Sequence, residues 1–180
     1  VSGGNTWNRE HSYPQSFFGE KAPMVSDTNH IYADDWKTNG VRGNKPFGDI
    51  DNVSSNEVLD SDKKLTANFS NASFFEPMDA VKRQVARATL YMYVRYNLAI
   101  ETNFQSLDLC LAWNNEFPVT TWEIERNNRV DAIQGNRNQF IDHPEFASRM
   151  FNPSSPVEPN QAKINEVINS ISSLPVNITL

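Results

Sequence analysis

An acidic residue and a histidine stand next to each other near the start of the chain, as Glu10 and His11. In an extended segment, neighbouring side chains point to opposite sides. The carboxylate could then bind a divalent cation while the imidazole faces the space from which a water molecule would attack. Histidine suits a general base because its ordinary pKa lies near neutrality. An isolated Glu-His pair is more often structural than catalytic, so the pair needs support from elsewhere in the chain.

A second stretch, residues 26–44, supplies a neutral oxygen donor and a guanidinium, Asn39 and Arg42. Oxygen ligands are what Mg²⁺ prefers, and the ion usually keeps several waters as its remaining ligands. Asn39 could therefore complete, with Glu10, the protein's share of a metal site. Without the first stretch, Asn39 in Thr-Asn-Gly would be interpreted as an ordinary turn residue.

The composition bounds the class of protein that must position these residues. The chain has 180 residues, of which 38% are hydrophobic, and this fits one ordinary globular domain rather than a disordered chain. No apolar run approaches the ~20 residues that a bilayer span requires, so no membrane association is expected. Cys110 is the single cysteine, which excludes an intrachain disulfide but not secretion. Because the chain begins with Val1 rather than Met, a signal peptide would lie outside it.

The net charge of −6 argues at first against a polyanionic partner, because phosphate binding draws most of its affinity from Lys and Arg. The distribution of charge softens this objection. Four basic residues fall between positions 80 and 100 with no acidic residue among them: Lys82, Arg83, Arg87 and Arg95. A local basic binding face is one interpretation of this cluster, and a solvated charged face is the other.

The rest of the pattern predicts a mainly helical chain. Residues 1–50 have the composition of loops, and the segments 56–59 and 65–69 indicate a β-hairpin or two between 48 and 75. Helices are predicted at about 79–97 with Asp79 as N-cap, at 106–115, at 120–133 behind the capping box of Thr120 and Glu123, and in a short segment from Pro144.

Two segments are expected along the chain. A domain over 1–150 carries the chemistry, and 151–180 forms a Pro-rich linker followed by an amphipathic helix.

The stretches around Glu10-His11 and Asn39 resemble the two halves of the active site in the bacterial endonuclease I family, which belongs to the ββα-metal, or His-Me finger, nucleases. The resemblance covers about residues 7–145. Further matching segments follow in the same order, at 44–48, 75–79, 85–96, 123–128 and 134–145. Such an ordered set is far more specific than any one motif.

The resemblance implies an α+β fold, mainly helical, in which a small β-hairpin-plus-helix finger holds the active site. His11 would be the general base, Glu10 and Asn39 the metal ligands, and these three the catalytic residues. His30 would form hydrogen bonds in the layer of residues behind this site. Substrate phosphates would be bound by Arg9, Arg42 and Arg87. Alternatively, Arg42 and Arg87 would brace loops through salt bridges.

The activity implied is a metal-dependent, sequence-nonspecific endonuclease, secreted to the periplasm or the medium. It would hydrolyse DNA, with RNA as a further candidate, by a water activated by His11, leaving 5′-phosphate and 3′-hydroxyl ends. Mg²⁺ is the expected cofactor, with Mn²⁺ or Ca²⁺ as alternatives. Trp7, Tyr13, Tyr32 and Trp36 would pack the finger or stack on bases.

Two other readings stay open. A protein of the same fold could bind nucleic acid without cutting it. Alternatively, the chain could be a surface interaction module. This class is favoured by glycosylation triplets at Asn52, Asn68, Asn71 and Asn177.

Overall fold

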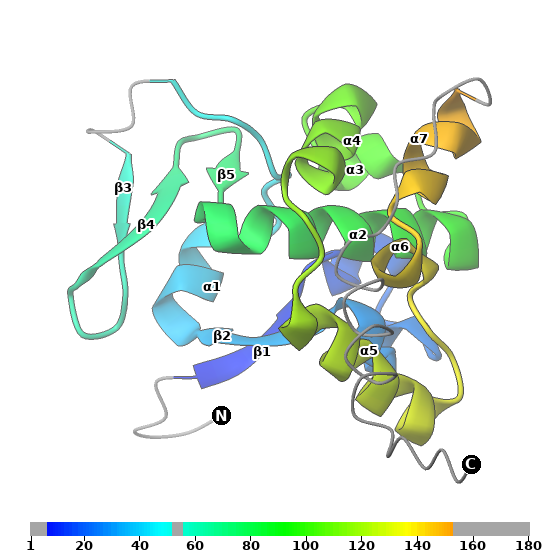
Figure 1. The fold of residues 1–180 in the computed structure, drawn as a ribbon. Coiled ribbons are helices and arrows are strands. Elements are labelled where there is room, and N and C mark those ends of the chain that lie inside the picture. The colour runs from blue at the N-terminus through cyan, green and yellow to red at the C-terminus, as the bar shows by residue number, and fades with distance from the viewer. Residues whose placement is uncertain (1–6, 52–55, 153–180) are drawn as a thin grey trace, which may run out of the picture.

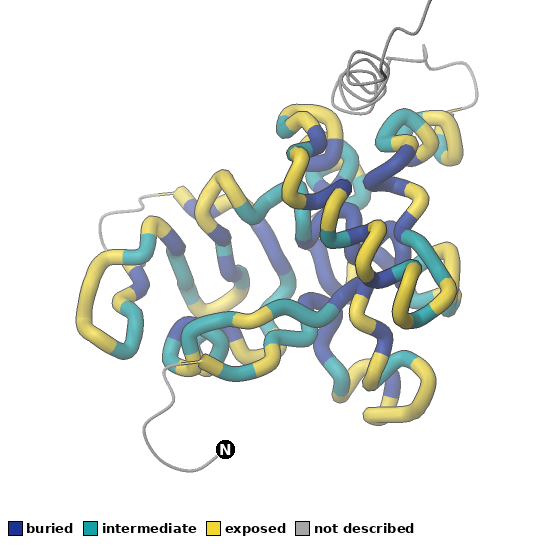
Figure 2. Tube along the Cα trace, turned by 60° about the horizontal axis from the view of Figure 1, so that its bottom comes forward, coloured by how far each residue is buried: buried dark blue, intermediate teal, exposed yellow. Residues whose placement is uncertain are grey.

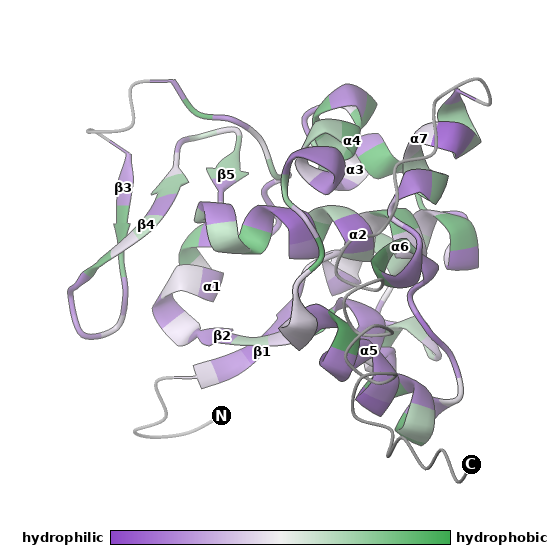
Figure 3. Ribbon diagram, viewed as in Figure 1, coloured by the Kyte–Doolittle hydropathy of each residue, from purple (hydrophilic) through white to green (hydrophobic). Residues whose placement is uncertain are grey.

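The longest helix, α2 (Asp79–Tyr96), runs through the middle of the fold in the computed structural model, which describes residues 7–51 and 56–152 (Figure 1). Residues 85–92 of this helix are all buried, and Figure 2 shows the buried parts of the chain gathered around it. The main apolar cluster forms between α2 and α4 and includes Leu90, Met92, Phe104, Cys110 and Trp113. Figure 3 shows apolar residues along α2 and α4, whereas α5 is mostly hydrophilic.

The finger expected from the sequence is present at one side of α2. Strand β1 (Trp7–His11) pairs antiparallel with β2 (Ile31–Asp35), and helix α1 (Trp36–Arg42) follows without a break. The Asp35 carboxylate fixes the start of α1 by accepting hydrogen bonds from the backbone amides of residues 37 and 38, both at 3.0 Å. Gly43, at a φ of 54°, ends α1, and its amide donates to the Asn39 carbonyl at 2.8 Å.

The loop that joins the two strands contains three short 3-10 turns, at Gln15–Phe18, Met24–Ser26 and Thr28–His30. Asp27 organises its second half, because this buried carboxylate accepts hydrogen bonds from the hydroxyls of Tyr91 and Tyr96 at 2.6 and 2.7 Å. The loop is thereby tied to α2.

A second antiparallel sheet lies beyond the finger, in the order β3-β4-β5. Its strands are β3 (Glu57–Leu59), β4 (Leu65–Ser70) and β5 (Phe75–Glu76). The predicted hairpin between 48 and 75 is confirmed, with one short strand added to it.

The predicted helices are confirmed with small changes at their ends. Besides α2, they are α4 (Leu107–Glu116), α5 (Thr121–Gln134) and α7 (Glu145–Phe151). Two single-turn helices, α3 (Ile100–Asn103) and α6 (Gln139–Asp142), were not predicted. The capping box at Thr120 and Glu123 is formed as expected. The N-cap of α2 was predicted wrongly: Met78 occupies that position, while Asp79 is the first helical residue and pairs with Lys82 at 3.0 Å.

The Pro-rich linker and C-terminal helix expected over 151–180 lie outside the described residues, apart from Phe151, which ends α7, and Asn152. Asn52 and Asn177 also lie outside the described residues. Among the helices that the structure describes, none has the length and apolar character needed to cross a membrane.

Candidate active site

Glu10 projects from the face of the finger hairpin that it shares with Asn8, Tyr32 and Asp34. This follows from the register, because Glu10 pairs with Tyr32 and Asn8 with Asp34, and directly opposed residues lie on one face. The side chain of Glu10 is only 14% exposed, and its Oε1 accepts a hydrogen bond from Arg42 at 2.6 Å. No residue that the structure describes bonds to the other oxygen, Oε2. Glu10 is therefore a partly buried carboxylate with one oxygen left over.

The electrostatic environment of Glu10 disfavours a negative charge. Burial raises the pKa of this carboxyl to about 7, against the opposing effect of Arg42, and the nearby charge of Asp34 raises it further. An added cation would reverse this balance, because it favours the ionised form.

Asn39 is held against β1 by its amide nitrogen. Nδ2 donates to Oδ1 of Asn8 at 2.8 Å and to the carbonyl of Arg9 at 3.2 Å. These bonds fix the orientation of the amide, and Oδ1 has no partner among the described residues. Asn39 and Arg42 are three residues apart on α1 and so lie on the same side of the helix, next to Glu10. The predicted metal ligands are thus near each other, and each keeps one oxygen.

His11 projects from the opposite face of the hairpin. Its Nε2 donates to the carbonyl of Val25 at 3.1 Å, since a carbonyl can only accept. In the neutral ring Nδ1 then carries the lone pair, and no described residue bonds to it. An unprotonated nitrogen without a partner is what a general base requires.

His30 lies behind His11, with the two ring centroids 5.4 Å apart. It is fully buried, its Nε2 donates to the carbonyl of Met24 at 2.8 Å, and its Nδ1 has no partner in the described part of the chain. Burial lowers the pKa of His30 to about 4, so the ring is neutral at physiological pH. This position is consistent with the supporting role expected for it.

Arg42 does not have the free guanidinium that phosphate binding requires. It is 2% exposed, and all five of its N–H donors are used within the protein. The acceptors are Oε1 of Glu10, Oδ1 of Asn103 and the carbonyls of His11, Ser12 and Lys45. Of the two interpretations given above, the structure supports bracing: Arg42 ties α1 to β1.

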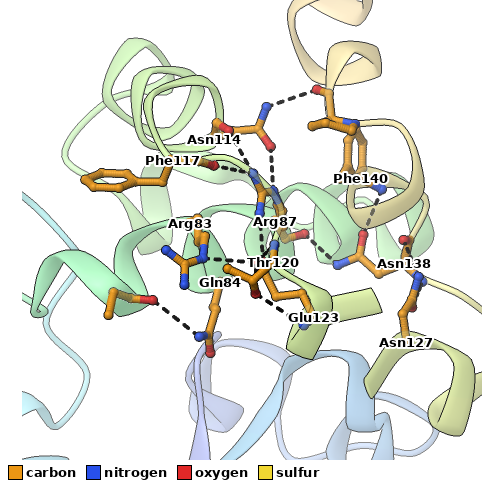
Figure 4. Close-up of polar contacts among 12 residues, drawn as sticks. Arg83, Gln84, Arg87, Asn114, Phe117, Thr120, Glu123, Asn127, Asn138 and Phe140 are labelled. Carbon is orange, nitrogen blue, oxygen red and sulfur yellow. Dashed lines mark hydrogen bonds and ion pairs between the residues drawn. The ribbon is translucent and has the colours of Figure 1, made fainter. Parts of the chain in front are cut away.

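Arg87 also braces the fold, within the helical body. It is 1% exposed in α2 and bonds to Glu123, Asn114 and the carbonyl of Phe117, which joins α2 to α4 and α5 (Figure 4). Two neighbours of Arg87 in the basic cluster are also neutralised internally, because Lys82 pairs with Glu76 and Arg83 with Glu123. Arg95 stays exposed near the end of α2, so the four residues do not form one basic face.

Arg9 is the predicted phosphate-binding residue that stays accessible. It is exposed on β1, and it shares the hairpin face of His11 because the two are two residues apart in the strand.

A cavity of about 610 Å³ lies beside Glu10. The finger contributes Glu10, Asp34 and Thr38 to its wall, and the helical body contributes residues that include Val81, Gln84, Trp122 and Arg129. Arg126 of α5 holds the two sides together, since it donates to the carbonyl of Ile31 at 2.7 Å and its guanidinium lies 4.4 Å from the centre of the Tyr32 ring. Tyr32 therefore packs the finger, which is one of the two roles predicted for it.

Sequence reasoning missed Asp34, Thr38 and Trp122 as residues of the site. Asp34 stands two residues after Tyr32 in the strand, so the sequence indicates that the two side chains share a face of the hairpin. Whether Glu10 lies on that face depends on the register of the two strands, which the sequence alone does not supply.

The donor set of the finger fits a hard divalent cation. The described residues contain no group of three or more His, Cys, Asp or Glu arranged to hold a metal ion. A cation at Glu10 would therefore need the amide oxygen of Asn39 and several waters, which is the coordination Mg²⁺ favours.

Comparison with known proteins agrees with the family indicated by the motifs. A family model described as Endonuclease I matches residues 1–145. An extracellular ribonuclease of Bacillus amyloliquefaciens is 35% identical over 163 residues, which cover 81% of this chain and 54% of the relative. One of Bacillus subtilis (strain 168) is 33% identical over 173 residues, covering 84% and 57%.

A relative of a different stated activity is also similar. An extracellular deoxyribonuclease of Aeromonas hydrophila is 33% identical over 119 residues, covering 66% of this chain and 50% of the relative. The chain thus spans about half the length of each of these three relatives.

Proposed function

The chain belongs to the endonuclease I family, and from this premise we propose that it is a metal-dependent endonuclease that hydrolyses phosphodiester bonds of DNA and RNA with little sequence preference. One observation carries the proposal. Glu10 and Asn39 are both fixed by hydrogen bonds, each retains an oxygen without a partner among the described residues, and no described residue bonds to Nδ1 of His11, which follows Glu10 in β1.

Glu10 and Asn39 would hold the divalent cation, with Mg²⁺ as the expected ion and Mn²⁺ or Ca²⁺ as alternatives. When bound, such a cation supplies electrostatic stabilisation of the charge that develops on the phosphate and on the leaving oxygen. Arg42 keeps the Glu10 carboxylate in place, and the bonds of Asn39 to β1 fix its amide so that the oxygen stays available.

His11 would remove the proton from the attacking water. Its Nδ1 accepts that proton while Nε2–H remains bonded to the carbonyl of Val25, which keeps the ring oriented. The water oxygen bonds to phosphorus, the bond from phosphorus to the 3′ oxygen breaks, and that oxygen takes a proton from solvent. The products carry 5′-phosphates and 3′-hydroxyls.

The range of nucleic acids that the site accepts depends on which parts of the substrate it contacts. Contacts to phosphate and sugar position a nucleic acid without identifying its bases. The names of the relatives include both ribonuclease and deoxyribonuclease, which supports a site that accepts either sugar. Their description as extracellular supports secretion of this protein.

The test is cleavage of supercoiled plasmid and of single-stranded RNA by the purified chain, with Mg²⁺ and with EDTA. We expect cleavage that requires the metal, and a loss of about 10²- to 10⁴-fold in His11→Ala, which is the effect typical of a general base. His143→Ala is the matched control because His143 is an exposed histidine on the helical body, bonded to Glu145 at 3.2 Å, and it should retain wild-type rates.

Two results would contradict the proposal. Full cleavage in the presence of EDTA would remove the metal from the mechanism. Folded wild-type protein that binds nucleic acid in a gel-shift assay but cuts none with Mg²⁺, Mn²⁺ or Ca²⁺ would identify a non-cleaving binding protein.

A further inference from the structure

Asp34 lies on the same face of the finger hairpin as Glu10. It is the cross-strand partner of Asn8, and Glu10 is the partner of Tyr32, so Asp34 and Glu10 occupy diagonal positions. Diagonal neighbours in an antiparallel pair are separated by about 7–8 Å at their Cα atoms. Two carboxylate side chains can span that distance toward a shared ion.

Asp34 has no basic partner that would explain its position. Its Oδ1 accepts only the amide of the next residue, Asp35, at 2.8 Å, and no described Lys or Arg forms an ion pair with it. Both Asp34 and Glu10 line the same cavity. Two carboxylates that face one space without a cation between them repel each other.

The amide of Asn39 is anchored beside Asp34. Nδ2 of Asn39 donates to Oδ1 of Asn8, and Asn8 is the residue directly opposite Asp34 in the hairpin. The oxygen of Asn39 therefore joins those of Glu10 and Asp34 around one region of the finger. These are three oxygen donors, two of them negatively charged, as a hard divalent cation requires.

Thr38 gives an independent indication that something polar occupies this region. It lines the same cavity, is 5% exposed, and its Oγ1 has no hydrogen-bond partner among residues 7–51 and 56–152. A buried hydroxyl without a partner destabilises a fold by about 1–3 kcal/mol. A water bound to a cation in the cavity would satisfy it.

We propose that Asp34 is a third oxygen ligand of the divalent cation, beside Glu10 and Asn39, and that the Thr38 hydroxyl bonds to a water in the coordination shell. This inference rests on the metal site of the proposed function and extends it by two residues. Asp34 sets how tightly the cation is held, because it adds a second negative charge to a site that otherwise has one.

Binding of Mn²⁺, measured by calorimetry on the full chain without nucleic acid, tests this assignment. We expect one site in the wild type, and a dissociation constant raised at least ~10-fold in both Asp34→Asn and Asp34→Ser, as for loss of a group that supports a metal. Asp62→Asn removes the same charge from an exposed carboxylate that does not line the cavity, and it should bind like the wild type. Thr38→Val keeps the shape of the side chain, and we expect a smaller loss of affinity from it.

The outcomes separate this assignment from the proposed function. Wild-type affinity in folded Asp34→Asn and Asp34→Ser, checked by circular dichroism, would overturn the role of Asp34 while leaving the metal site of Glu10 and Asn39 intact. Wild-type protein that binds no Mn²⁺ would overturn the metal-dependent function itself. A loss in both Asp34 variants with Asp62→Asn unchanged would support the third ligand.

Discussion

Two buried arginine–glutamate pairs stand in different parts of the molecule, Arg42–Glu10 in the finger and Arg87–Glu123 in the helical body. Their shortest N···O distances are 2.6 and 2.7 Å, and both arginines are almost fully buried. The glutamates differ. Oε1 of Glu123 accepts from Arg87, and its Oε2 accepts from Arg83 and from the amide and hydroxyl of Thr120 (Figure 4). Among the residues that the structure describes, Glu10 accepts only from Arg42.

The difference separates a structural ion pair from one that is poised to bind. A buried carboxylate is stable when hydrogen bonds satisfy both of its oxygens, and Glu123 meets that condition. Glu10 does not, and its raised pKa records the imbalance. The comparison predicts that changes at Glu10 affect activity and that changes at Glu123 affect stability.

The largest expected effect is on catalysis, in Glu10→Gln. The amide still accepts a hydrogen bond from Arg42 but carries no charge for a cation, so the rate should fall on the order of 10³-fold, because a metal supplies several kcal/mol of charge stabilisation. Plasmid cleavage under saturating Mg²⁺ measures this. The melting temperature should change little, since burial already disfavours the charged form of Glu10. Glu116→Gln, an exposed change at the end of α4, serves as the control.

In the helical body the same substitution should act on folding. Glu123→Gln leaves Arg87 and Arg83 without a counter-charge in a buried site, and breaking such a pair lowers the free energy of unfolding by about 3–5 kcal/mol. Urea denaturation measures the loss, and the rate per folded molecule should stay near that of the wild type. Glu125→Gln, in the same helix but exposed, should shift stability by less than ~0.5 kcal/mol. Equal stability of the two variants would remove the distinction between the regions.

The free energy of unfolding should also depend on pH through His30 of the finger, which separates the finger further from the helical body. The pKa of His30 is about 4 in the folded protein and about 6.5 when unfolded, so only the unfolded chain takes up a proton between these values. The stability contributed by the neutral ring is complete above pH 6.5 and declines as the pH falls toward 4, by about 3 kcal/mol in all.

Comparison of the wild type with His30→Gln isolates this effect. Glu10 and Asp34 have raised pKa values and act in the opposite direction over part of the same range. The free energy of unfolding of the wild type minus that of the variant should therefore decrease from pH 7 to pH 4. A difference that stays constant with pH would show that His30 is not buried in its neutral form.

Local features were predictable from the sequence, whereas features set by distant partners were not. The capping box at Thr120 needs only residues three apart, and the finger follows from an ordered set of motifs. Arg42 and Arg87 could bind phosphate or brace the fold, because a guanidinium does either, and only the three-dimensional acceptors decide. Asp34 required the pairing of two strands whose register depends on an intervening loop.

The smallest expected effect concerns the cap that completes the Glu123 network. Thr120 Oγ1 accepts from the amide of Glu123 at 3.3 Å and donates to Oε2 of Glu123 at 2.9 Å. Thr120→Ala removes both bonds, and loss of an N-cap hydroxyl lowers stability by about 1 kcal/mol. Thr120→Ser retains the hydroxyl and should recover most of that loss. Since Glu123 keeps both arginines in either variant, we expect urea denaturation to show a change several-fold smaller than in Glu123→Gln. An alanine variant as unstable as Glu123→Gln would show that the cap, rather than the pairing with arginine, holds the helical body together.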